Sequence, residues 1–85
     1  MEERVLTLYS RQGCHLCDQM WEQLQELRRQ IPIRIVLVDV DSAPELQAHY
    51  GTRVPVLVHA EYELSELFLD EARVREYLCD RVNGV

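Results

Sequence analysis

The sequence predicts an α/β fold in which a four-stranded mixed sheet has helices on both faces. Short runs of apolar and β-branched residues alternate with helical segments in the order β-α-β-α-β-β-α. The first strand, helix and second strand form a βαβ unit, which requires two parallel strands and a right-handed crossover. The third and fourth strands are separated by a tight turn and are expected to pair as an antiparallel hairpin. A chain of 85 residues is too short for two cores, so residues 1–85 are expected to form one domain.

The first strand is predicted over residues 5–9 and the first helix over residues 16–31. The strand is mostly apolar, as expected when both faces of a central strand are buried. Gly13 supplies a permissive backbone just before the helix, in which apolar residues recur along one face. They are Leu16, Cys17, Met20, Trp21, Leu24, Leu27 and Ile31. Pro32 is expected to end the helix, because proline disfavours a helical backbone in the residue that precedes it.

Three further strands are predicted in the rest of the chain. Residues 33–40 are mostly apolar and β-branched and are expected to form a second buried strand. Asp39 and Asp41 lie at its end, where a loop-capping role is expected. Residues 54–59 form the third strand, and residues 61–64 are expected to return beside it as the second arm of the hairpin.

Two further helices are predicted from their capping residues. Ser42 and Glu45 have the spacing of a capping box, and Pro44 is suited to a first helical turn. Gly51 is expected to end this short helix. Asp70 is expected to cap the last helix. The side chains expected on its buried side are Val74, Tyr77, Leu78 and Val82.

Composition excludes several classes of partner. The formal net charge of -6 argues against nucleic-acid binding, because a protein of this charge cannot neutralise many phosphates. No apolar run approaches the length of a membrane span, and the acidic N-terminus leaves no room for a signal peptide. Three cysteines are an odd number for a framework of structural disulfides. We therefore expect a monomer of the cytoplasm, with mostly reduced thiols and no membrane or nucleic-acid partner.

Cys14 and Cys17 lie at the predicted start of the first helix. Backbone N–H groups and the helix dipole lower the pKa of a thiol at a helix N-terminus, so Cys14 is the expected nucleophile. Arg11 adds a positive neighbour in the preceding loop, and His15 adds another when it is protonated. Cys17 lies one turn further on and is expected to resolve a mixed disulfide formed by Cys14. Asp18 opposes the effect, because its negative charge in the same turn disfavours a thiolate.

Two cysteines at this spacing can also form half of a zinc site. A closed zinc site needs four ligands. The other candidate ligands are His15, His49, His59 and Cys79, and none of them forms a second pair at ligand spacing. The two cysteines therefore predict a redox pair rather than a metal site. Cys79, in the last helix, is expected to be a small buried apolar residue, because free cysteines are usually buried.

Motifs along the whole chain resemble those of glutaredoxins, within the thioredoxin-like superfamily. They are Tyr9-Ser10-Arg11, Cys14-His15-Leu16-Cys17 and, after a Tyr50-Gly51 pair similar to that of thioredoxin, Val54-Pro55. The resemblance implies that the peptide bond before Pro55 is cis and that this proline faces the thiols. It also implies that the backbone of Val54 can pair with an extended substrate. In glutaredoxins the residue corresponding to Arg11 contacts a glutathione carboxylate.

The sequence departs from the glutaredoxin pattern in several places. His15 and Leu16 replace the proline–aromatic pair usual between the cysteines and are expected to tune the redox pair. Arg53 replaces the threonine that usually precedes the Val-Pro pair. Residues 64–67 replace the Gly-Gly turn that cradles glutathione, and Glu66 would repel a glutathione carboxylate. The first strand also lacks the buried aspartate of thioredoxins. The resemblance therefore implies the fold more firmly than it implies glutathione dependence.

Together these features predict a glutaredoxin-like thiol–disulfide oxidoreductase that acts in cell redox homeostasis. Its substrate would be a disulfide-containing protein or a small-molecule thiol. The redox-active disulfide is the only cofactor expected, with glutathione or a reductase protein as the source of electrons. Two alternatives stay open. The fold could serve as a non-catalytic adaptor that binds a peptide beside Pro55, or two chains could share zinc or an iron–sulfur cluster through Cys14 and Cys17.

Overall fold

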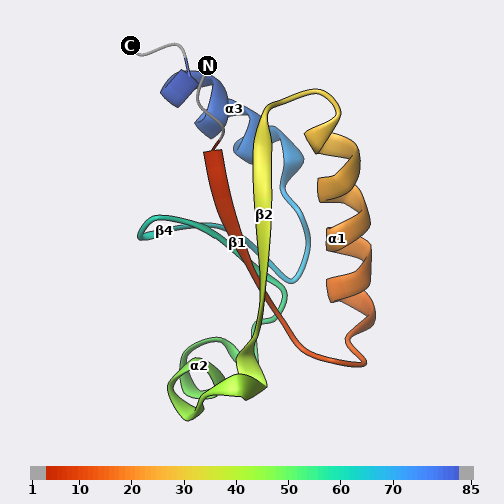
Figure 1. Ribbon diagram of the computed structural model, residues 1–85, viewed down its shortest axis with the longest axis vertical. Helices are drawn as coiled ribbons and strands as arrows, with labels where there is room; N and C mark the ends of the chain where they lie inside the picture. Colours follow the sequence, from red (N-terminus) through yellow and green to blue (C-terminus); the bar gives the residue numbers. More distant parts are fainter. Residues whose placement is uncertain (1–3, 83–85) are drawn as a thin grey trace.

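The computed structural model describes residues 4–82 and confirms the predicted order of strands and helices (Figure 1). The elements are β1 (Arg4–Ser10), α1 (His15–Arg28), β2 (Ile33–Asp39), the 3₁₀ turn η1 (Val40–Ser42), α2 (Pro44–Tyr50), β3 (Val56–His59), β4 (Tyr62–Glu66) and α3 (Glu71–Val82). The sequence pattern does not predict η1. None of the described helices has both the length and the apolar character needed to cross a lipid bilayer.

The strands form one mixed sheet in the order β2-β1-β3-β4. β1 pairs in parallel with β2 and antiparallel with β3, and β3 pairs antiparallel with β4. β1 is therefore a central strand, as its composition predicts, but only Leu6 and Leu8 are buried and Val5 is exposed, so the expected burial of both faces is wrong. β2 is an edge strand, and its Val36 and Leu37 side chains are exposed, so the prediction of a second buried strand is wrong. A short apolar run does not reveal whether another strand will pair outside it.

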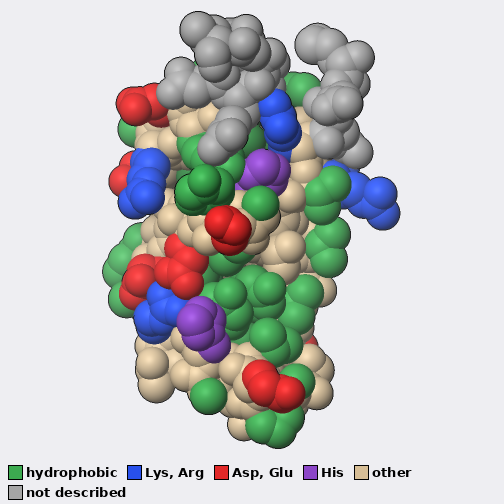
Figure 2. Space-filling view, turned by 90° about the vertical axis from the view of Figure 1, so that its left-hand side faces the viewer, with side chains coloured by type: hydrophobic (Ala, Val, Ile, Leu, Met, Phe, Trp, Pro, Cys, Tyr) green, Lys and Arg blue, Asp and Glu red, His purple; other side chains and the backbone are tan. Residues whose placement is uncertain are grey.

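The core lies between one face of the sheet and helices α1 and α3 (Figure 1). It consists of Leu6, Leu8, Met20, Leu24, Leu27, Ile33, Leu57, Leu64, Val74 and Leu78. Each fully buried leucine contributes about 1.5–3 kcal/mol, so this layer is the main source of stability. α2 covers part of the opposite face, where Tyr50 stacks on Tyr9 with ring centroids 4.0 Å apart. Hydrophobic side chains gather on this face beside α2 (Figure 2), and Val5 and Val36 are exposed there.

The start of α2 differs from the predicted capping box. Its N-cap residue is Ala43, which has no side chain able to cap the helix. Ser42 belongs to η1 instead, and its hydroxyl donates to the Asp39 carbonyl at 2.7 Å. The predicted capping role of Ser42 is therefore wrong. Pro44 occupies the first turn of α2, as predicted.

The ends of α1 and α3 agree only in part with the prediction. α1 ends three residues before Ile31, although Ile31 still packs against the core. Asp70 caps α3 as predicted, because its carboxylate accepts a hydrogen bond from a backbone N–H of the first turn at 3.1 Å. Of the residues expected on the buried side, Val74 and Leu78 are buried, Tyr77 is half-buried, and the side chain of Val82 lies outside the described residues.

Candidate redox site

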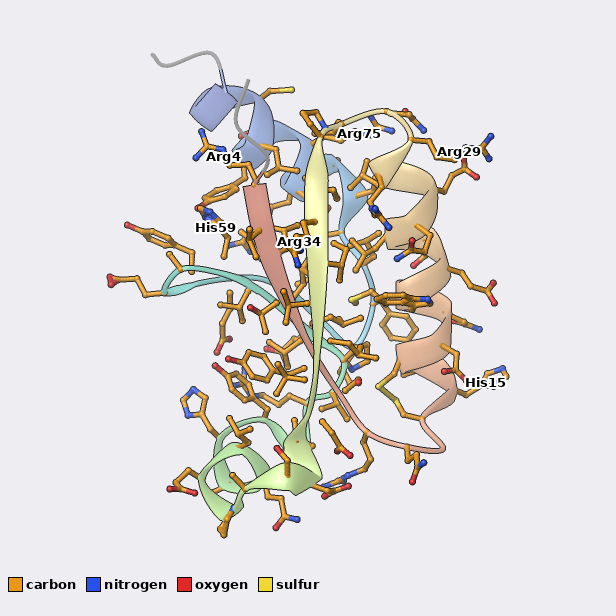
Figure 3. The ribbon with its side chains drawn as sticks, in the orientation of Figure 1. Arg4, His15, Arg29, Arg34, His59 and Arg75 are labelled. Atoms are coloured by element: carbon orange, nitrogen blue, oxygen red, sulfur yellow. A yellow bond between two sulfur atoms is a disulfide. The ribbon has the colours of Figure 1, made fainter. Side chains whose placement is uncertain are left out.

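The loop of residues 11–14, called the redox loop below, connects β1 to α1. Gly13 has φ +76° in this loop, a conformation that glycine adopts far more readily than other residues. The Cys14 N–H donates to the Arg11 carbonyl at 3.3 Å and closes the turn. Cys14 is the N-cap residue of α1, and Cys17 lies in its first turn. Their Cα atoms are 5.2 Å apart, and their sulfur atoms form a disulfide (Figure 3).

The backbone places a hydrogen-bond donor at the sulfur of Cys14. The N–H of Cys17 points at this sulfur, with 3.1 Å between nitrogen and Sγ. In the reduced protein the same N–H would face the Cys14 thiolate, and a donor at a helix N-terminus favours the charged form of a thiol. Cys14 is half-buried, whereas Cys17 is only 3% exposed. These exposures fit the predicted assignment of attack to Cys14 and resolution to Cys17.

Val54 and Pro55 lie at the same end of the sheet as the redox loop. Antiparallel pairing places Val56 of β3 opposite Tyr9 of β1, so Pro55 lies beside the end of β1, where the redox loop begins. The Val54–Pro55 peptide bond is cis, as the resemblance implies. Pro55 is buried, and its carbonyl accepts a hydrogen bond from the Leu67 N–H at 2.8 Å. The structure therefore brings the redox loop, the Val54-Pro55 segment and Leu67 to the same end of the sheet.

The Arg11 side chain binds Asp41 and Gly51, which are 30 and 40 positions further along the chain. Its Nε and Nη2 atoms donate to the two carboxylate oxygens of Asp41 at 3.1 and 3.0 Å, and its Nη1 donates to the Gly51 carbonyl at 3.2 Å. Gln47 also donates to Asp41 at 3.0 Å. The hydrogen bond from Arg11 holds the pKa of Asp41 below its usual value, and Asp41 in turn raises the pKa of Arg11. Arg11 thus links the redox loop to η1 and the end of α2, with its charge balanced by Asp41.

Gly51 ends α2 where the Arg11 side chain arrives. Its φ is -54°, so it is not the left-handed glycine that commonly ends a helix. A Cβ at this position would overlap the Gln47 carbonyl and lie 3.3 Å from the Arg11 guanidinium. Glycine is therefore needed here for space rather than for backbone freedom.

The two residues between the cysteines lie in different surroundings. His15 is exposed and projects outward from α1, away from the disulfide (Figure 3). Leu16 is half-buried and lines a small hollow together with Met20 and residues 67–69. The tuning role predicted for His15 and Leu16 stays a prediction.

A larger cleft of about 380 Å³ opens beside Cys17. It lies between the redox loop, the first two turns of α1 and the end of β2, and its lining includes Asp18, Trp21, Leu37 and Asp39. Trp21 packs against the core as predicted and also borders this cleft. The cleft brings solvent to a cysteine that is otherwise almost fully buried.

Cys79 is exposed on α3, so the prediction that it is buried is wrong. The buried side of α3 passes through Val74 and Leu78, and the residue after Leu78 points to a different side of the helix. Within residues 4–82, no three His, Cys, Asp or Glu side chains come together in a way that could hold a metal ion.

Asp41 and Leu67 shape the site although the sequence does not single them out for it. The N–H of Asp41 bonds to the Asp39 carboxylate at 2.8 Å, so the expected loop-capping role is present. Its own carboxylate, however, binds Arg11 across 30 positions of the chain. Leu67 bonds to Pro55 from a different loop. Neither contact has a local sequence signal, because both partners are distant in the chain.

Comparisons with known proteins agree with this architecture. Residues 5–79 match the family model described as "Glutaredoxin-like domain (DUF836)". The chain is 35% identical over 80 residues to the uncharacterized protein Rv0508 of Mycobacterium tuberculosis, covering 88% of this chain and 82% of that protein. The solution structure of protein Ne2328 from Nitrosomonas europaea matches with a TM-score of 0.84 at 35% identity, covering 92% of this chain and 94% of that one. A thioredoxin from Halobacterium salinarum matches with a TM-score of 0.63 at 24% identity, covering 93% and 74%, which shows that the fold is that of thioredoxin.

Proposed function

Because this chain belongs to the glutaredoxin-like domain family, we propose that it is a thiol–disulfide oxidoreductase whose redox pair is Cys14 and Cys17. The proposal rests on the hydrogen bond from the Cys17 N–H to the Cys14 sulfur at the start of α1, combined with the burial of Cys17. A thiolate in this position is stabilised, accessible to a substrate and within reach of a second thiol. We expect the protein to act as a monomer in the cytoplasm.

The proposed reaction begins when the Cys14 thiolate attacks one sulfur of a substrate disulfide. A mixed disulfide forms, and the other substrate sulfur leaves as a thiolate, which takes a proton from water. Cys17 then loses its proton and attacks the Cys14 sulfur, which forms the Cys14–Cys17 disulfide and releases the second substrate thiol. The substrate gains two electrons and the protein dithiol loses them. Water in the cleft beside Cys17 can accept the Cys17 proton.

Return to the dithiol requires two electrons from another dithiol or from a pair of glutathione molecules. We expect glutathione to be a poor donor, because the groups that would bind its carboxylates are engaged or unsuitable. Arg11 is bound to Asp41, and Glu66 stands where glutaredoxins have glycine. Arg53 offsets part of the Glu66 charge at 3.3 Å, but its guanidinium also binds Glu63 and is therefore already engaged. A reductase protein is therefore the expected donor.

The test of this reaction uses a Cys79→Ser background, because Cys79 is exposed and would react with disulfides by itself. The reduced protein is mixed with a chromogenic aromatic disulfide, and the released thiolate is followed by absorbance. The parent should release two equivalents and end as the Cys14–Cys17 disulfide. Cys17→Ser should release one equivalent and remain as a mixed disulfide, visible by mass spectrometry. Cys14→Ser should react at least about 100-fold more slowly, because the remaining thiol is buried and lacks the activating helix terminus.

Equal rates for the parent and Cys14→Ser would contradict the proposed roles. The electron donor is tested separately with the oxidised protein. NADPH consumption is measured with glutathione and glutathione reductase, and then with thioredoxin reductase. We expect faster turnover with thioredoxin reductase. Efficient turnover with glutathione at ordinary affinity would overturn the donor assignment without affecting the assignment of the cysteines.

A further inference from the structure

The chain turns sharply at residues 66–68, between β4 and α3. The Phe68 N–H donates to the Glu66 carbonyl at 2.7 Å, and Leu67 between them has φ +67°. A hydrogen bond that spans two residues around a positive φ is a γ-turn of the rare, strained kind. The left-handed region is unfavourable for leucine, whereas glycine would adopt it without strain. A strained backbone held in place beside a candidate site is a reason to look for a function.

Two hydrogen bonds hold this γ-turn beside the redox site. The Leu67 N–H donates to the Pro55 carbonyl at 2.8 Å, and the Asp70 N–H donates to the Ser65 hydroxyl at 3.1 Å. The turn cannot relax without losing its bond to Pro55. The γ-turn leaves two large apolar side chains at the surface, because Leu67 is 38% exposed and Phe68 is 67% exposed. Leu67 and Phe68 thus place two adjacent apolar side chains at the surface, next to the hollow that they line.

The γ-turn forms one wall of the small hollow that Leu16 also lines. Leu67, Phe68 and Leu69 line it on one side, and Leu16 and Met20 of α1 line it on the other. The remaining lining consists of two glutamine side chains of α1, so no charged group borders it among the residues that the structure describes. Neither redox cysteine lines this hollow, but Leu16, which separates them in the sequence, does.

The size of the hollow restricts what it can hold. Its volume is about 70 Å³. A site for a complete small molecule usually has a volume of about 300–1,000 Å³. The hollow can therefore accept one side chain of a larger partner but not a whole ligand. Its leucine, methionine and phenylalanine side chains match an apolar side chain, and none of its lining side chains carries a positive charge for the carboxylates of glutathione.

We propose that Leu16, Leu67 and Phe68 bind an apolar side chain that adjoins the disulfide cysteine of a protein substrate. Neighbouring residues of a chain are separated by about 3.8 Å at Cα, so a residue next to the attacked cysteine can reach a hollow that begins at Leu16. The inference rests on the proposed redox function of Cys14. It narrows the substrate class to protein or peptide disulfides flanked by a large apolar residue.

The test compares two peptide disulfides in the Cys79→Ser background. Each is the symmetrical disulfide of a short peptide, with phenylalanine or serine after the cysteine, and hydroxyethyl disulfide serves as a small reference substrate. Single-turnover rates with the reduced protein should be about tenfold higher for the phenylalanine peptide, the usual discrimination of an apolar pocket. Phe68→Ser should lower this preference to about twofold, and the ratio of the two peptide rates is the readout. Val36→Ser is the matched control, because Val36 is also exposed but lies on β2, on the opposite face of the sheet.

Each outcome separates this inference from the proposed function. Equal rates for the two peptides, with normal reduction of hydroxyethyl disulfide, would overturn the inference and leave the redox function intact. A preference that survives both Phe68→Ser and Leu67→Gly would also overturn it. A dimer that sedimentation detects in the parent and not in Phe68→Ser would assign the surface to a second copy of the chain. A protein that reduces none of the three disulfides would refute the redox function, and this inference with it.

Discussion

Replacing Gly13 by alanine tests whether backbone conformation alone holds the redox loop. Gly13 has φ +76°, and a Cβ at this position would have no heavy atom within 4 Å, so alanine would clash with no neighbour. The loss of stability then comes from the backbone conformation, because a positive φ costs an L-residue such as alanine about 1–2 kcal/mol. Alanine also restricts the unfolded chain, which offsets about 0.4–1 kcal/mol of this loss. We expect the free energy of unfolding of the oxidised protein to fall by about 1 kcal/mol.

The measurement is urea unfolding of the oxidised protein, followed by far-ultraviolet circular dichroism. With an m-value of about 1 kcal/mol/M for a small domain, the midpoint should fall by about 1 M at constant m. Gly13→Asn is the control, because asparagine enters the left-handed region more easily than alanine and should lose less than half as much. An unchanged midpoint for Gly13→Ala, or equal losses for both variants, would show that something other than backbone conformation controls the loop.

Two further predictions concern the ion pairs near the site. Arg11→Gln and Asp41→Asn should change the rate of peptide disulfide reduction by the same factor, and the double variant should add nothing, because the two side chains act as one link. If Arg11 were instead a glutathione ligand, Arg11→Gln alone would raise the KM for glutathione. The second prediction follows from Arg53, which lowers the pKa of Glu63, and from Arg11, which lowers the pKa of Asp41. A carboxyl group whose pKa is lower in the folded state stabilises the fold above its unfolded pKa, and this contribution is lost as the pH falls through the folded value. Thermal melts should therefore show stability decreasing below about pH 4.5, the ordinary pKa of glutamate, and Arg53→Gln should weaken this dependence. An identical pH profile for Arg53→Gln would contradict the assignment.

The order of the elements and the redox pair could be predicted because both depend on residues close together in the sequence. The apolar run of residues 5–9 and the helical stripe that follows it identify their elements without knowledge of any partner. Cys14 and Cys17 are about one helical turn apart, so their proximity follows from helix geometry. The edge position of β2 could not be predicted, because it depends on which strands pair and not on the composition of residues 33–39.

For Ser42, the prediction that its hydroxyl bonds to nearby backbone is confirmed, but the prediction that it caps α2 is wrong. Serine hydroxyls bond to nearby backbone groups in several arrangements, of which the helix cap is one. In this chain the hydroxyl bonds to the Asp39 carbonyl within η1, and α2 begins at Pro44 without a side-chain cap. Cys79 illustrates the same limit, because the usual burial of cysteine is an average that the position on α3 overrides.

The surroundings of the redox loop could not be predicted, because they are assembled from segments far apart in the chain. The bond from Arg11 to the Gly51 carbonyl and the bond from Leu67 to the Pro55 carbonyl bring these segments to the redox loop. The Arg11 side chain and the Leu67 N–H could each donate to many other carbonyl groups, so no local sequence pattern identifies the acceptor. The proposed chemistry needs only two thiols at one helix end, whereas the proposed choice of substrate depends on the side chains that the γ-turn exposes. Relatives that keep the cysteines but change Phe68 should therefore keep the reaction and differ in the disulfides that they reduce.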